Sequence, residues 1–84
     1  GVREDPAEQV AELYVAVCPR LIGYLTVLTG SRADAEEIAQ DAFVQAYLNL
    51  DRYNARWRFK TWLFVIAQRL LIDRLRRARR RRRT

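Results

Sequence analysis

The chain has 84 residues, half of them hydrophobic, so it is long enough for one small domain with a modest core. One cysteine, Cys18, excludes an intrachain disulfide framework and suits a reducing cytoplasm. The absence of histidine excludes the usual zinc sites and His-activated nucleophiles, and there is no glycine-rich phosphate loop. The apolar run Leu63–Ala67 is far too short to cross a bilayer. The sequence therefore predicts no enzyme, metal, cofactor, small-molecule substrate or membrane contact.

Charge is divided unevenly along the chain, although the net value is +6. Residues 1–51 carry nine carboxylates against three arginines, whereas residues 52–84 carry twelve arginines and Lys60 against Asp73. This division predicts two partners, one that meets an acidic surface and a polyanion that meets the basic part.

The first predicted helix spans residues 6–29. Asp5–Glu8 can form its start, with an aspartate cap, a proline at the first position and a glutamate for a capping box. Pro19 should kink or split the helix, and Gly30 should end it. Its apolar side has the helical spacing of three and four residues and comprises Val10, Leu13, Tyr14, Val17, Leu21, Leu25 and Leu28.

The second predicted helix spans residues 34–50, with Asp34 as its cap and Glu37 completing a capping box. Alanines dominate its apolar side, which predicts close approach of neighbouring helices. That side comprises Ala35, Ile38, Ala39, Ala42, Phe43, Ala46, Tyr47 and Leu50.

The third predicted helix spans residues 61–78 and follows a loop, residues 51–60, that lacks helical periodicity. Thr61 can cap it. The arginines beyond Arg76 repel one another, so this tail should fray unless an anion orders it. Three amphipathic helices with short connections predict an all-α protein, a compact three-helix bundle.

The loop mixes cations with aromatic rings, as single-strand binders do, because cations follow phosphates and rings stack on unpaired bases. Trp57 lies between two arginines, which favours exposure and base contact, whereas core packing explains Trp62 equally well. On the third helix, Gln68 and Arg69 are residue types that read base edges in the major groove, although phosphate contact alone would also explain the arginines. Asp73 should pair with an arginine within a turn.

Residues 34–47, DAEEIAQDAFVQAY, resemble region 2.2 of the sigma-70 family. Leu50–Tyr53, Phe59–Leu63 and Asp73–Arg77 follow at the expected distances and resemble regions 2.3 and 2.4 of its extracytoplasmic-function group. Tyr14 and Pro19–Leu21 are more loosely similar to the end of region 2.1. Each segment alone is a weak signal, but the ordered set is specific and covers residues 6–78.

The resemblance implies the fold of sigma region 2 and two sets of contacts. The second helix would meet the β′ clamp helices of core RNA polymerase through Glu37, Gln40, Asp41 and Tyr47. The loop would hold a base flipped out of the promoter −10 element, and the third helix would read the upstream end of that element. The residues expected to contact DNA are Arg52, Tyr53, Asn54, Arg56, Trp57, Arg58, Lys60, Thr61, Trp62, Gln68, Arg69, Arg76 and Arg77.

The resemblance also implies an anti-sigma partner and a division of the chain. Residues 1–5 would be an N-terminal tail or cloning remnant, residues 6–78 the sigma region 2 domain, and residues 79–84 the start of a linker to an absent region 4. Arg58 and Arg69 depart from the group's usual small polar residue and asparagine, so its promoter preference does not transfer. Val65 and Ile66 replace the aromatic wedge of housekeeping factors, which implies weaker melting.

Two other interpretations fit parts of the sequence. Charge alone would also suit a helical module that binds nucleic acid without sequence preference. A basic amphipathic helix can also bind anionic lipid, in which case the tryptophans would lie on the buried face. Neither alternative gives Glu37, Gln40 or Asp41 a role.

Overall fold

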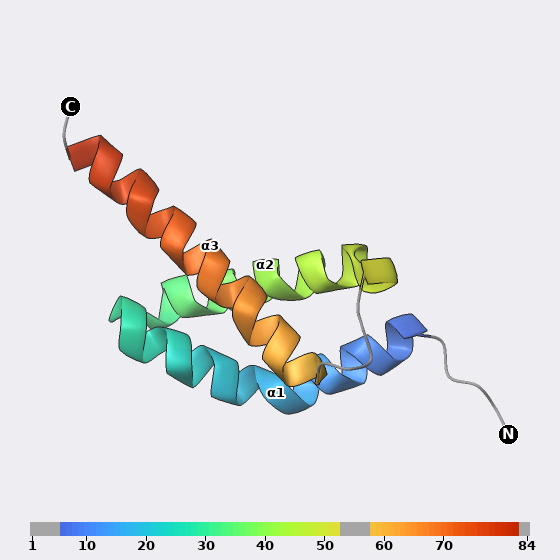
Figure 1. Ribbon diagram of the computed structural model, residues 1–84. Helices are drawn as coiled ribbons and strands as arrows, with labels where there is room; N and C mark the ends of the chain where they lie inside the picture. Colours follow the sequence, from blue (N-terminus) through green and yellow to red (C-terminus); the bar gives the residue numbers. More distant parts are fainter. Residues whose placement is uncertain (1–5, 53–57, 83–84) are drawn as a thin grey trace, which may run out of the picture.

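The structure is a computed structural model that describes residues 6–52 and 58–82. It contains helix α1 (Pro6–Thr29), helix α2 (Arg32–Leu48), the short 3-10 helix η1 (Leu50–Arg52) and helix α3 (Phe59–Arg82). The described residues form no strand, so the all-α prediction is confirmed. Figure 1 shows α1 and α2 running in opposite directions as a hairpin, with α3 crossing over both.

The turn between α1 and α2 is built by Gly30 and Ser31. Gly30 adopts a φ of 71°, the left-handed conformation that glycine reaches without a steric penalty, and its N–H donates to the Thr26 carbonyl at 2.8 Å. Gly30 therefore ends α1 as predicted. Ser31 then caps α2, because its Oγ accepts a hydrogen bond from the Asp34 N–H at 3.2 Å.

The predicted start of α2 at Asp34 was wrong. Asp34 occupies the third helical position, where its N–H is one of the donors that the Ser31 hydroxyl satisfies. The other end of α2 is also earlier than predicted. Asn49 closes the helix through a hydrogen bond from its Nδ2 to the Gln45 carbonyl at 2.8 Å.

Pro19 lies inside α1 without splitting it. Figure 1 shows a single helix that curves along its length. Pro19 is exposed, and so is Val15, whose carbonyl loses its helical donor at the proline. Water can reach a carbonyl on this side, so the helix continues through the proline.

Helix α3 begins at Phe59, two residues before the predicted cap Thr61. The Trp62 N–H donates to the Arg58 carbonyl at 3.1 Å, so Arg58 stands where the cap was expected. The helix also continues to Arg82, beyond the predicted end at residue 78. Arginine has a high helix propensity, and the negative end of the helix dipole favours cations in the last turn.

The core lies where α2 packs against α1 and α3. Alanines of α2 are fully buried, as the sequence predicted, and their small side chains let the helices approach closely. Leu21, Leu25, Ile38 and Leu63 are the largest fully buried side chains among the described residues. The buried set is Leu21, Leu25, Ala35, Ile38, Ala39, Ala42, Ala46, Phe59, Leu63, Ala67 and Leu71.

Within α1, the segment Ala11–Thr29 is long and apolar enough to cross a membrane by length and composition, with a mean hydropathy of 1.4. Polar residues interrupt this segment, so it contains no long uninterrupted apolar run. Only 11% of the segment is buried, and Val27 is 83% exposed on its outer side. Length and composition alone are weak evidence for a membrane span, because core helices of soluble proteins and N-terminal signal sequences share them.

Candidate functional site

The exposed side of α3 forms one stripe opposite the core. The buried residues Leu63, Ala67 and Leu71 face α1 and α2. Residues at the complementary helical positions are all exposed, since successive side chains turn by about 100° around the axis. We call this the α3 stripe, and it consists of Thr61, Val65, Gln68, Arg69, Ile72 and Arg76.

Gln68 on the α3 stripe is anchored to α1. Its Nε2 donates to the Tyr24 hydroxyl at 2.9 Å, and the Tyr24 ring packs against Phe64 with 5.4 Å between ring centroids. The bond uses one of the two N–H groups of the amide. The hydrogen bond holds Gln68 in one orientation on the exposed side of the helix.

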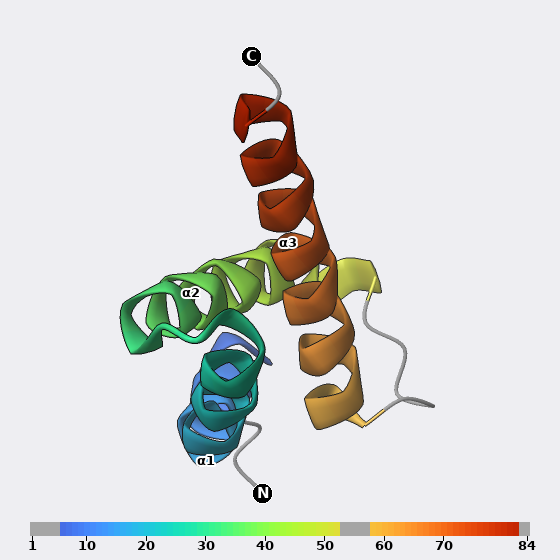
Figure 2. The same cartoon turned by 90° about the vertical axis from the view of Figure 1, so that its left-hand side faces the viewer.

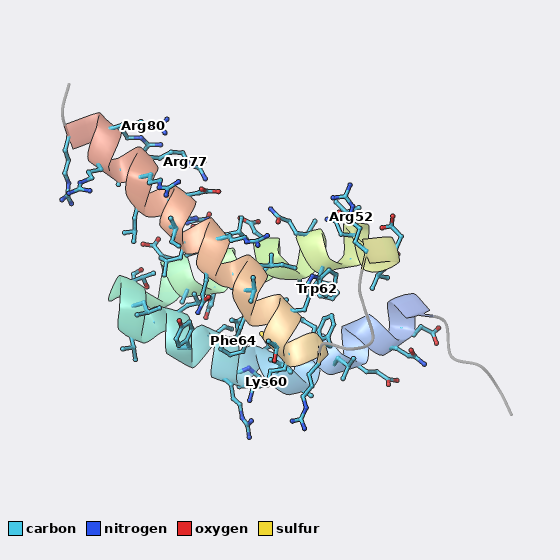
Figure 3. All side chains as sticks on the ribbon, viewed as in Figure 1. Arg52, Lys60, Trp62, Phe64, Arg77 and Arg80 are labelled. Carbon is cyan, nitrogen blue, oxygen red and sulfur yellow. The ribbon has the colours of Figure 1, made fainter. Side chains whose placement is uncertain are left out.

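Among the residues that the structure describes, the cations predicted to bind DNA lie at several places on the surface. Arg52 ends η1 and Lys60 lies in the first turn of α3, and Figure 3 shows these two cations apart. Arg77 turns about 100° away from Arg76 and lines a groove toward α2, so it is not part of the α3 stripe. Arg58 is exposed just before α3.

The aromatic residues at the start of α3 pack on the core. Phe59 is buried, and Trp62 is half-buried with its ring edge-on to Phe59 at a centroid distance of 6.1 Å. Trp62 therefore packs on the core, one of the two roles considered for it, and part of its ring stays accessible. Four residues predicted to bind a flipped base lie outside the described residues, namely Tyr53, Asn54, Arg56 and Trp57.

The acidic side of α2 is exposed and contacts α3 through one arginine. Glu37, Gln40 and Asp41 all lie on the surface. Arg74 Nη1 is 3.6 Å from Glu37 Oε2, and Arg74 Nη2 is 3.5 Å from Asp41 Oδ2. A single guanidinium therefore joins two carboxylates that lie one turn apart.

Sequence reasoning missed Arg74. It expected Asp73 to pair within a turn, but no such ion pair forms among the described residues. The position of Arg74 could have been found, because it lies three residues after Leu71 and extends the buried side of α3 toward α2.

Tyr47, the fourth residue predicted to bind polymerase, continues the surface of α2 and is 48% exposed. Its ring lies 6.4 Å from that of Phe43, which in turn packs on Tyr14 at 4.3 Å. Phe43 is half-buried, consistent with the core role expected for it. Burial, reinforced by a hydrogen bond with Cys18, raises the pKa of Tyr14 well above its usual value of 10.

An open groove of about 560 Å³ separates the C-terminal half of α3 from α2 and the end of α1. Its α2 wall is acidic and its α3 wall is basic, over an apolar floor. Lining residues include Leu28, Asp34, Glu37, Ile38, Asp41, Leu71, Arg74, Leu75, Arg77 and Arg81. Among the described residues, no group of His, Cys, Asp or Glu side chains could hold a metal ion.

These features define a class: a small helical domain with an acidic face on one helix and a basic, exposed stripe on another. The chain belongs to the Sigma-70 region 2 family, whose model matches residues 13–81. The resemblance inferred from the sequence is thereby confirmed.

Two relatives share much of this sequence. The "ECF RNA polymerase sigma factor SigW" of Bacillus subtilis is 44% identical over 77 residues, which cover 87% of this chain and 37% of that protein. The "Probable RNA polymerase sigma factor" of Haemophilus influenzae is 43% identical over 42 residues, covering 50% of this chain and 22% of that protein. The chain thus spans little more than a third of the longer match. No solved structure matches the chain.

Proposed function

We propose that this chain is the domain of an extracytoplasmic-function type transcription initiation factor that docks on core RNA polymerase and recognises the promoter −10 element. The observation that carries the proposal is the separation of two chemically opposite surfaces on one bundle. Acidic and polar residues cover α2, and the α3 stripe presents arginines on the side away from the core. Family membership supplies the transcription context.

Docking would use the exposed face of α2. Glu37 and Asp41 are 65% and 60% exposed, and Gln40 lies between them on the surface. Carboxylates that are this exposed can accept hydrogen bonds from cations of the β′ clamp helices. Tyr47 would add apolar contact at the C-terminal end of the same face.

DNA recognition would use the α3 stripe. Gln68 and Arg69 are held on the outer side of a helix that is packed on its opposite side, so their positions are fixed relative to the docking face. Glutamine and arginine side chains form paired hydrogen bonds with base edges. Arg76 lies two turns further along the stripe, where it would contact the phosphate backbone.

The domain would favour melting of the promoter DNA by binding only the melted form. The loop residues Tyr53, Asn54, Arg56 and Trp57 have the chemistry to hold an extruded base. Extrusion costs a few kcal/mol of lost stacking, which one pocket and several phosphate contacts can offset. A protein that binds only the melted state shifts the equilibrium toward it.

We further propose that the domain acts in the cytoplasm and that an anti-sigma factor regulates it. A regulator that covers Glu37, Gln40 and Asp41 would exclude polymerase by occupying the same surface. The groove beside this face, with an acidic and a basic wall, offers such a regulator an adjoining apolar floor.

The test is to select oligonucleotides from a random pool of DNA duplexes in the presence of bacterial core polymerase. We expect an enriched −10 motif, and we expect Gln68→Ala or Arg69→Gln to weaken binding of that motif by about 1–3 kcal/mol. Arg20→Gln is the matched control, since it removes an exposed arginine from α1.

Three outcomes would contradict the proposal. If no motif is enriched and every oligonucleotide binds equally, the domain is a nonspecific nucleic-acid binder. Binding that tracks the anionic lipid content of vesicles rather than DNA would indicate a membrane-surface protein. Equal losses in Arg20→Gln and Arg69→Gln would mean that only net charge matters.

A further inference from the structure

Helix α3 continues well past the core. Its last buried residue is Leu71, and the helix reaches Arg82, roughly 16 Å further at 1.5 Å per residue. Residues 76–82 are all exposed, and all are arginine except Ala78. Figures 1 and 2 both show this segment extending beyond α1 and α2. We call Arg76–Arg82 the arginine arm.

Repulsion between its arginines destabilises the helix of the arginine arm. Like charges three or four residues apart destabilise a helix by roughly 0.2–0.5 kcal/mol per pair, and the arm contains several such pairs and no carboxylate. It buries no apolar side chain that could offset this repulsion. A polyanion that neutralised Arg79, Arg80 and Arg82 would therefore stabilise the arm.

The arginines surround the axis of the arm. Successive side chains turn by about 100°, so Arg80 and Arg82 point to nearly opposite sides. Arg80 stands clear of α1 and α2 in Figure 3, whereas Arg77 lines the groove toward α2. A flat anionic surface, such as a membrane, would contact only one side of this helix. A groove with phosphates along both walls would contact several sides at once.

The major groove of B-DNA has these dimensions. It is about 12 Å wide, and an α-helix with its side chains measures about 10–12 Å. The major groove of duplex RNA is too narrow and deep, and a single strand offers only one row of phosphates. We propose that the arginine arm enters the major groove of duplex DNA next to the −10 element and contacts phosphates of both strands.

This inference rests on the proposed function, because the α3 stripe and the arginine arm are parts of one helix. If the stripe faces the −10 element, the same helix carries the arm toward adjoining duplex. The arm would supply affinity without sequence preference, since phosphate contacts carry no base information.

The test is a fluorescence anisotropy titration of the 84-residue chain with a labelled DNA duplex at several salt concentrations. We expect Arg80→Gln and Arg82→Gln each to reduce the slope of log K against log salt by about 0.9, because each removes one phosphate contact. Arg20→Gln on α1 should leave the slope unchanged. If only one of the two arm variants changes the slope, the arm contacts one row of charges and the proposal is wrong.

A second readout follows the helix itself. Circular dichroism should show a gain in the helix that survives heating when duplex DNA is added, and a smaller gain with single-stranded DNA, duplex RNA or vesicles of anionic lipid at equal phosphate concentration. An equal gain with all four polyanions would overturn the choice of the major groove. If Arg69→Gln weakens duplex binding while Arg80→Gln and Arg82→Gln do not, the arm proposal fails and the proposed function stands. If none of the three does, duplex recognition by α3 fails as well.

Discussion

Substituting Arg74 by glutamine tests how strongly α3 is held to α2. Arg74 is 32% exposed and bridges Glu37 and Asp41 at 3.6 and 3.5 Å, distances longer than those of strong charge-assisted hydrogen bonds. Ion pairs with partners this exposed contribute roughly 0–1 kcal/mol each. The substitution also leaves two carboxylates facing each other one turn apart, which costs about 0.2–0.5 kcal/mol. We expect Arg74→Gln to lower the free energy of unfolding by about 1 kcal/mol.

The assay is thermal unfolding at low and high salt. A loss of 1 kcal/mol corresponds to a decrease in Tm of roughly 4–8 °C for a domain of this size. Salt screens exposed charges, so the decrease should shrink as the ionic strength rises. Arg69→Gln is the matched control, because it removes an exposed arginine from the opposite side of the same helix.

A double-mutant cycle decides whether the loss comes from the ion pairs. In a Glu37→Gln, Asp41→Asn background, Arg74→Gln should have no further effect on the free energy of unfolding. A loss above about 3 kcal/mol that salt does not change would refute the reasoning, because packing of the arginine stem would then dominate. An unchanged Tm at low salt would also refute the reasoning, because the ion pairs of Arg74 would then contribute nothing to stability.

Three further predictions follow from the fold. Leu63→Ala should lower the free energy of unfolding in urea by about 2–5 kcal/mol because Leu63 is fully buried, while Val65→Ala on the exposed side of α3 should cost far less. Ser31→Ala should lower the free energy of unfolding by about 1 kcal/mol, because α2 loses its cap. Ser31→Asp should lower it much less, because aspartate can also cap the helix. Burial raises the pKa of Tyr14, so its contribution to stability is complete below about pH 10 and is lost as pH rises through the raised value. Stability should therefore decline less steeply above pH 10 in Tyr14→Phe than in the parent, and an identical decline would contradict this.

Helix positions followed from the sequence wherever one local signal dominated. The span of α1 was predicted to the residue, because Pro6 suits the first helical position and Gly30 reaches the left-handed conformation that ends a helix. The start of α2 was misplaced because Ser31 and Asp34 are both good caps, and three-dimensional context chose the first. The end of α3 was misplaced because charge repulsion was weighed above the propensity of arginine for helix.

The candidate site was predictable where it depends on helical spacing. The exposed positions of Gln68, Arg69 and Arg76 follow from the apolar side of α3 alone. The pairing of Arg74 with Glu37 and Asp41 depends on how α3 crosses α2, and a single sequence does not contain that geometry. The same crossing turns Arg77 toward the groove, which the sequence had grouped with Arg76.

The central claim is that α2 and α3 serve different partners, and one paired measurement tests it directly. Binding of bacterial core polymerase and binding of the selected −10 oligonucleotide would be titrated separately for two variants. We expect Gln40→Ala with Asp41→Ala to lose polymerase binding and to keep the isolated domain's DNA binding. Gln68→Ala with Arg69→Gln should do the reverse, and both variants should keep a near-parental Tm. Loss of both partners in either variant, or of neither, would contradict the division of roles between the two helices.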